Sequence, residues 1–311
     1  MKLILPVFAV VLGSLSAHAA DERCLAKFQK YVDSKIELGV PEKHLPKIYL
    51  PEKENGKVAV FIHGMFESPY FYKGIANTLR DRGYIVVAPL LSGHWEANWS
   101  NFDRVSYRDW LRDSRAAIDV ARCLSPYILL GGHSTGGLLA IHEAVQNPDH
   151  VTGLMLWSPA VQLGNMAYFG GLVGRAFGLS GNTFKWSKPD HDETTYYSPN
   201  SAVQLQKLLD FVRIADGKGK MVNIYKRLTM PTFLAYAEDD PVIPVADQTL
   251  AGYQITGIRD VMFFNKATKI WHEGVAKFPE DAYKAKPWDI NTHWVEMKDR
   301  MEKFLNGILF K

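Results

Sequence analysis

The sequence predicts an α/β fold with a mostly parallel central sheet flanked by helices. Short runs rich in β-branched and apolar residues alternate with longer stretches of helical character. Most of these runs lack alternating polar residues, which is typical of strands buried on both faces of a parallel sheet. The alternation of strand and helix favours right-handed crossovers between parallel strands. The predicted strands span residues 58–62, 84–91, 127–130, 151–157, 232–236 and 261–264.

Four of the intervening stretches have clear helical character. One begins near Ser106, where Asp109 lies three residues further on, the spacing of a capping box. The others are predicted over residues 70–82, 136–147 and 292–307.

Composition narrows the class of protein. The 311 residues include 47% hydrophobic and 12% aromatic residues, enough to bury a sizeable core in one large domain or two ordinary ones. A net charge of +3 gives no support to a role in binding nucleic acid or an acidic membrane surface.

The N-terminus has the pattern of a secretory signal peptide. Lys2 precedes an apolar stretch over residues 3–15, and small residues at Ala17 and Ala19 form a cleavage site. A membrane span needs about 20 apolar residues, more than this stretch offers. We therefore expect residues 1–19 to be removed, and residues 20–311 to be exported to a periplasm or the extracellular medium.

The two cysteines, Cys24 and Cys123, are too few for a disulfide-dense scaffold or a four-cysteine zinc site. In an oxidising compartment they could pair and tie the mature N-terminus to the end of a helix. Two buried free thiols are the alternative.

One interval breaks the strand–helix rhythm. About 65 residues, from 163 to 227, separate two successive strands, more than a simple crossover needs. We predict that this segment is a cap inserted over the carboxyl edge of the sheet; an ordinary helical connection with a long loop is the alternative. Apolar residues early in the segment, between 166 and 177, could line an acyl-chain pocket or pack the cap onto the core.

The strongest motif is Gly-His-Ser-Thr-Gly, which places Ser134 between a predicted strand and a predicted helix. In such a nucleophile elbow, G-x-S-x-G, the serine adopts a strained conformation and the glycines let strand and helix approach closely. A serine hydroxyl also needs a histidine base and an acid that orients the histidine. The pattern therefore predicts a serine nucleophile, with the acid and the histidine later in the chain.

Both partners have candidates after later strands. The acid is expected from the cluster Glu238-Asp239-Asp240, where we favour Asp240 over Asp239 because a proline follows it and holds the turn. The base is expected to be His272, with His293 at the start of the last helix as its rival.

An acyl-transfer site also needs hydrogen-bond donors for the developing oxyanion. We assign these donors to the backbone N–H groups of Thr135, directly after the nucleophile, and of Met65, in the glycine turn after the first predicted strand. The side chain of His63 is expected to hold that turn rather than to carry protons.

The motifs FIHGMFES, PLLSGHW, GGHSTGG, AEDDPVIPV and IWHEG together resemble the α/β-hydrolase superfamily, in particular its carboxylesterase and monoacylglycerol-lipase-like branch, which also holds serine aminopeptidases. The resemblance runs from about Val58 to the C-terminus. It implies a Ser134–Asp240–His272 triad, an oxyanion hole at Met65 and Thr135, a structural role for the Gly93-His94 loop, and no metal or organic cofactor.

The resulting prediction is an exported serine hydrolase that cleaves a small-molecule or lipid ester through an acyl-enzyme. Two alternatives remain. An aminopeptidase would cleave an amide and bind a free amine, and acidic residues Asp190, Asp192 and Glu193 in the predicted cap could serve it. A binding protein with an inactive hydrolase fold is disfavoured because all triad residue types are present.

Overall fold

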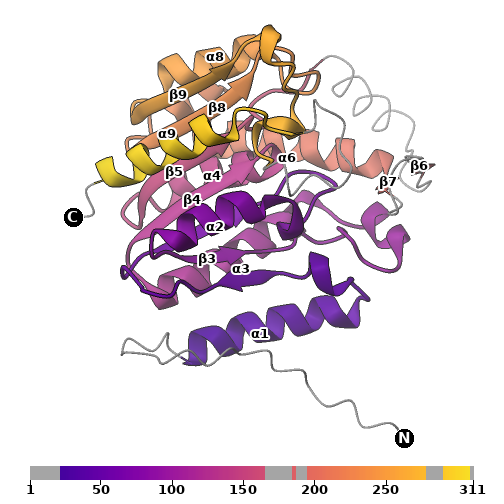
Figure 1. Cartoon of the computed structure of the whole chain (residues 1–311). Coiled ribbons are helices and arrows are strands. Elements are labelled where there is room, and N and C mark those ends of the chain that lie inside the picture. The colour runs from indigo at the N-terminus through magenta and orange to yellow at the C-terminus, as the bar shows by residue number, and fades with distance from the viewer. Residues whose placement is uncertain (1–21, 165–183, 187–194, 278–289, 309–311) are drawn as a thin grey trace, which may run out of the picture.

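A seven-stranded sheet forms the centre of the molecule (Figure 1). The structure, a computed structural model, describes residues 22–164, 184–186, 195–277 and 290–308. The strand order is β1-β3-β2-β4-β5-β8-β9, and every neighbouring pair is parallel except β1 with β3. The strands are β1 (Lys47–Tyr49), β2 (Val58–Ile62), β3 (Ile85–Ala88), β4 (Ile128–His133), β5 (Val151–Trp157), β8 (Thr232–Ala237) and β9 (Ile258–Phe264). The predicted α/β class with a mostly parallel sheet is confirmed.

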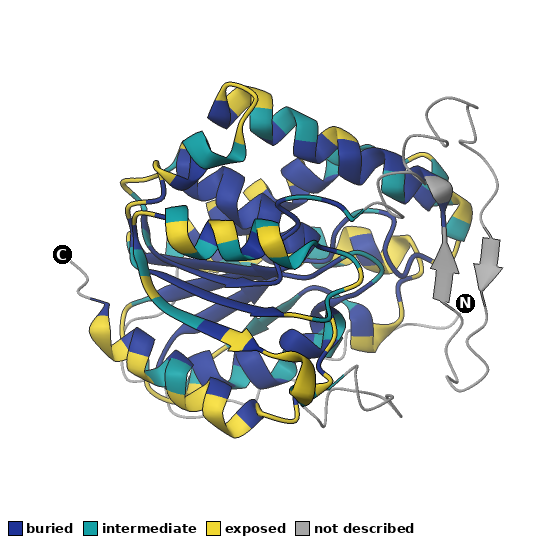
Figure 2. Ribbon diagram, turned by 90° about the horizontal axis from the view of Figure 1, so that it is seen from above, coloured by how far each residue is buried: buried dark blue, intermediate teal, exposed yellow. Residues whose placement is uncertain are grey.

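The central strands are buried on both faces, as the lack of polar alternation predicts (Figure 2). In β2, Val58 and Val60 pack into one core cluster and Ala59 and Phe61 into the other, because successive side chains point to opposite faces. The second face is covered by α2 (Lys73–Asp81) and α9 (Trp294–Gly307), and the first by α3 (Tyr107–Leu124), α4 (Thr135–Gln146) and α8 (Val245–Gln254). Short 3₁₀ turns lie at Glu42–His44, Pro69–Tyr72, Trp99–Asp103, Lys266–Thr268 and Glu273–Val275.

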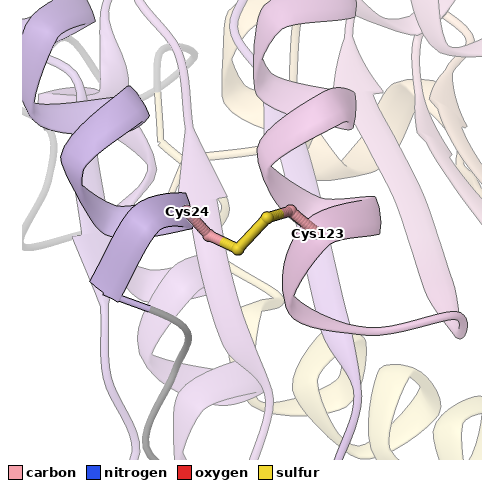
Figure 3. The surroundings of a disulfide bond; sticks show 2 residues. All are labelled: Cys24 and Cys123. Atoms are coloured by element: carbon pink, nitrogen blue, oxygen red, sulfur yellow. A yellow bond between two sulfur atoms is a disulfide. The ribbon is translucent and has the colours of Figure 1, made fainter.

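The region before the first predicted strand adds two elements that the sequence left unassigned. Helix α1 (Glu22–Glu37) packs along α3, and β1 adds an antiparallel edge to the sheet. Cys24 on α1 and Cys123 on α3 form a disulfide (Figure 3), so the pairing alternative holds and the free-thiol alternative is wrong. The proposed signal peptide lies outside the described residues.

The predicted cap segment is described only in part. Its described elements are β6 (Phe184–Trp186), β7 (Thr195–Tyr197), α6 (Pro199–Gly217) and α7 (Met221–Tyr225). Helix α6 is fixed to α4 by a buried pair, in which His142 Nδ1 lies 2.6 Å from Asp216 Oδ2. The apolar residues at 166–177 and the acidic residues Asp190, Asp192 and Glu193 lie outside the described residues, so the cap stays a prediction. In the part of the chain that the structure describes, no helix combines the length and apolar character needed to cross a membrane.

Candidate active site

Ser134 lies in a sharp turn between β4 and α4, at the carboxyl edge of the sheet. Its backbone has φ 51° and ψ −116°, a positive-φ conformation that a residue with a side chain rarely adopts. Such strain costs on the order of 1–3 kcal/mol and persists only where the surroundings hold it. Here the Ser134 N–H donates to the Trp157 carbonyl at 3.0 Å, and the Ser134 carbonyl accepts from Ala160 N–H at 2.9 Å.

The glycines flanking the serine are required by close backbone contacts. A Cβ at Gly132 would collide with the Gly136 backbone, and a Cβ at Gly136 would collide with the Ile62 carbonyl. These contacts give the predicted steric reason for G-x-S-x-G, because strand β4, helix α4 and the end of β2 meet at van der Waals distance. The hydroxyl of Ser134 is thereby held at the end of the strand.

The structure brings the three predicted side chains into one hydrogen-bonded chain. His272 Nε2 lies 2.8 Å from Ser134 Oγ, and His272 Nδ1 lies 2.7 Å from Asp240 Oδ2. Asp240 follows β8 and His272 follows β9, so neighbouring parallel strands deliver both residues to the edge where Ser134 lies. All three side chains are buried or nearly so. This geometry fits a hydroxyl whose proton is accepted by an oriented imidazole.

The Asp240 carboxylate is held by more than the histidine. One oxygen accepts the N–H groups of Val242 and Ile243, both at 2.8 Å, and the other accepts from the Gln248 side-chain amide at 3.0 Å. Burial would raise the pKa of Asp240, but the charge and hydrogen bond of His272, together with the two backbone donors, outweigh it and lower the pKa. Asp240 is therefore ionised at neutral pH.

The contact with Asp240 also shifts the pKa of His272. Burial would lower the pKa of His272, but the charge and hydrogen bond of Asp240 outweigh it, and the net pKa is raised above its ordinary value. An imidazolium formed during proton transfer is thus stabilised at this position.

The alternative candidates for the acid and the base lie away from Ser134. Asp239 lies 3.7 Å from the ammonium of Lys266, and Glu238 accepts the Lys266 N–H, so both face that loop. His293 immediately precedes α9, with its ring half exposed and 3.7 Å from Glu296. The geometry therefore favours Asp240 over Asp239 and His272 over His293.

The two proposed oxyanion donors flank Ser134. Thr135 is the first residue of α4, where the amide has no acceptor within the helix. The loop that carries Met65 also lies against the nucleophile, since a Cβ at the preceding Gly64 would be 3.3 Å from Ser134 Cβ. Both amides are thus carried by segments that border the serine.

His63 holds its loop, as expected from the sequence. Its Nδ1–H donates to the Gly64 carbonyl at 2.7 Å, and its Nε2 accepts the Leu91 N–H at 3.0 Å. Burial lowers the pKa of His63 to about 4, so the ring is neutral at physiological pH. His94 is likewise buried, with Nδ1 near the Leu91 and Ser92 carbonyls, which fits the structural role expected of the Gly93-His94 loop.

Sequence reasoning missed three residues that lie at the border of the site. Gln248 supports Asp240, and His133 and Glu67 form buried contacts behind His272. Glu67 and His133 stand inside the motifs FIHGMFES and GGHSTGG, but the pattern alone gave them no partner. Within the described residues, no group of three or more His, Cys, Asp or Glu side chains converges as a metal site.

A family model described as serine aminopeptidase, S33, matches residues 53–273, which is 221 of the 311 residues. The chain belongs to this family. The match includes all five predicted site residues, and it ends one residue after His272.

Two of the similar proteins carry the names of lipid hydrolases. A thermostable monoacylglycerol lipase from Bacillus sp. (strain H-257) is 27% identical over 197 residues, covering 61% of this chain and 74% of the relative. A phospholipase from Bacillus subtilis (strain 168) is 36% identical over 108 residues, covering 34% of this chain and 41% of the relative.

Solved structures of low identity share the fold. The monoacylglycerol lipase of Paleococcus ferrophilus superposes with a TM-score of 0.60 at 17% identity, covering 84% of this chain and 98% of that one. The monoglyceride lipase of Saccharomyces cerevisiae gives 0.62 at 13% identity, covering 84% and 91%. The comparisons confirm an α/β-hydrolase of the monoacylglycerol-lipase-like branch and support the prediction of a serine ester hydrolase.

Proposed function

We propose that the protein is an exported serine hydrolase that cleaves lipid or other apolar carboxylic esters, with Ser134 as nucleophile, His272 as general base and acid, and Asp240 as the residue that orients His272. The observation that carries the proposal is the hydrogen-bonded chain from Asp240 through His272 to Ser134 Oγ, at a strained turn. The lipase names of the relatives support an ester substrate.

The reaction proceeds in two half-reactions. In the first, His272 Nε2 takes the hydroxyl proton while Ser134 Oγ attacks the ester carbonyl, and the Met65 and Thr135 N–H groups stabilise the oxyanion. The oxyanion collapses, the ester C–O bond breaks, and His272 returns the proton to the leaving alcohol. In the second, a water loses its proton to His272 and attacks the acyl-enzyme carbonyl. The bond to Ser134 Oγ then breaks, His272 returns the proton to Oγ, and the acid leaves.

The ester proposal is tested with p-nitrophenyl esters of short to long acyl chains, using purified mature protein and Ser134→Ala. We expect turnover that the substitution abolishes, and the preferred chain length measures the acyl pocket. Aminoacyl p-nitroanilides run in parallel test the alternative suggested by the family's name. Turnover of the anilides alone, lost in the same variant, would replace the ester proposal with an aminopeptidase.

Export is supported by the leader pattern and by the disulfide, since disulfides persist in oxidising compartments. Intact-mass measurement of protein from fractionated cells tests it. A chain that begins at Ala20 in the periplasm or medium is expected, whereas a full-length chain with reduced cysteines in the cytoplasm would contradict export.

A further inference from the structure

Glu67 is a buried carboxylate that the proposed mechanism does not use. It lies just after the oxyanion loop and is 6% exposed. Its two oxygens contact three separate segments of the chain, the oxyanion loop, the end of β4 and the loop after His272.

The first contact is with the oxyanion loop itself. Glu67 Oε2 accepts the Gly64 N–H at 3.0 Å, and a Cβ at Gly64 would collide with that oxygen and lie 2.8 Å from His133 Nδ1. The intervening Phe66 has φ 64°, a left-handed conformation that is strained for a residue with a side chain. A strained loop keeps its shape only where other contacts hold it, and the Glu67 carboxylate supplies one next to Met65.

The second contact leads to the catalytic histidine. Glu67 Oε2 lies 3.0 Å from His133 Nδ1, which is also 2.8 Å from the Tyr72 hydroxyl. On the other side of the ring, His133 Nε2 lies 3.0 Å from the His272 backbone carbonyl. Because a carbonyl only accepts, Nε2–H donates to it. The residue directly before Ser134 thus bonds the backbone of the residue that activates Ser134.

The third contact is an ion pair. Lys277 Nζ lies 3.0 Å from Glu67 Oε1, and its side chain is only 12% exposed. Lys277 stands five residues after His272 in the same loop. Burial would raise the pKa of Glu67, but the charges of Lys277 and His133 outweigh it and hold the pKa well below its usual range.

We propose that Glu67, His133 and Lys277 form a positioning clasp, which sets the oxyanion loop and the His272 loop at their working distances from Ser134. The carboxylate accepts the Gly64 N–H, contacts the His133 ring and forms an ion pair with Lys277, so its charge and both of its oxygens are used. Glu67→Gln keeps the size of the side chain but leaves one acceptor oxygen and no charge. The glutamine cannot keep its contacts with Gly64, His133 and Lys277 at the same time. The oxyanion loop and the His272 loop then shift relative to Ser134.

The clasp acts on the transition state rather than on substrate binding. Losing one oxyanion donor costs about 10²–10³ in kcat, and a misplacement near 1 Å costs about 10². We therefore expect Glu67→Gln to lower kcat about 10- to 100-fold with KM changed less than about threefold, and Lys277→Met, which removes one contact, to lower kcat less.

A matched control separates positioning from stability. Asp216 is a similarly buried carboxylate paired with a histidine, but it joins α6 to His142 on α4 rather than to the oxyanion loop or the His272 loop. Asp216→Asn should lower the melting temperature while kcat stays within about twofold of the parent. A kcat loss in Asp216→Asn equal to that in Glu67→Gln would overturn the clasp, since general loosening would then explain both.

This inference rests on the proposed function, so a readout independent of the substrate accompanies the kinetics. The rate constant for labelling of Ser134 by an alkyl fluorophosphonate reports nucleophile and oxyanion hole without any ester. We expect Glu67→Gln to label at least about 10-fold more slowly at equal folded fraction. Labelling at the parent rate overturns the clasp. Parent protein that labels but hydrolyses no ester refutes only the ester proposal, and the clasp is then judged on the labelling rates.

Discussion

The disulfide between Cys24 and Cys123 should be the largest single contribution to stability that can be removed without touching the site. Replacing both cysteines with alanine opens a covalent loop, because the two residues are 99 positions apart. Helix α1 keeps other attachments, since the Tyr31 hydroxyl donates to the Leu90 carbonyl and buried Lys35 lies 3.7 Å from Asp113. The folded structure should therefore persist, and the loss arises mainly in the unfolded chain.

The magnitude follows from the loop length. In the chain-entropy account, closing a loop of this size removes about 16 cal/mol/K from the unfolded state, or about 4.7 kcal/mol at 25 °C. For a chain of this size that corresponds to a fall in melting temperature on the order of 10 °C. The site lies at the carboxyl edge of the strands, so kcat should stay within about twofold.

The measurement is urea unfolding followed by tryptophan fluorescence, for the parent, the double alanine variant and the parent with a reducing agent. Reduced parent and alanine variant should lose similar free energies of unfolding. A loss below about 1 kcal/mol in both would contradict this prediction, because the disulfide would then not constrain the unfolded chain. A large loss of activity at full folded fraction would show that α1 acts on the site.

Four further substitutions test the site. Asp240→Asn should lower kcat about 10³- to 10⁴-fold, which is about 4–5.5 kcal/mol of transition-state stabilisation. The same substitution should move the acid limb of the kcat/KM–pH profile to lower pH. The Asp240 charge raises the pKa of His272, and without it the burial that lowers this pKa remains. An unmoved limb in stopped-flow or steady-state assays would mean that another group titrates. His272→Ala should lower kcat at least about 10⁴-fold while His293→Ala leaves it within about twofold, and the reverse result would exchange their roles. Gly136→Ala should destabilise the fold by about 3 kcal/mol or more, because the new methyl meets backbone at Ile62; a melting temperature equal to the parent's would contradict the close packing at the elbow.

The sheet was predictable because its strands are apolar on both faces. The runs at 58–62 and 151–157 match β2 and β5 to the residue, while 84–91 shortens to β3, since its last residues enter the Leu90–Gly93 loop. The capping box before α3 also holds, with Asp109 accepting the Ser106 N–H at 2.7 Å. The edge strand β1 escaped prediction because it gains its stability from β3, a contact that no local pattern encodes. Helix α1 does carry a local signal, since Cys24 and Phe28 recur at helical spacing on its buried face, but its packing on α3 is a long-range contact.

The candidate site likewise contains residues that a local pattern predicts and residues that it does not. Ser134 has a local signal, since the glycines around it are required by backbone contacts, and Asp240 and His272 follow strands in the expected order. Glu67 has no such signal, because its partners lie 66 and 210 positions further along the chain. The pairing exists only once β2, β4 and the loop after β9 meet at one edge of the sheet.

The proposed mechanism requires that Ser134 becomes acylated. It is tested most directly by quenching a reaction with p-nitrophenyl butanoate in acid within milliseconds, measuring the intact mass and mapping the modified peptide. We expect a burst of about one p-nitrophenolate per protein, one butanoyl group on Ser134, and neither in Ser134→Ala. A butanoyl group on another residue, or undiminished turnover in the alanine variant, would contradict it.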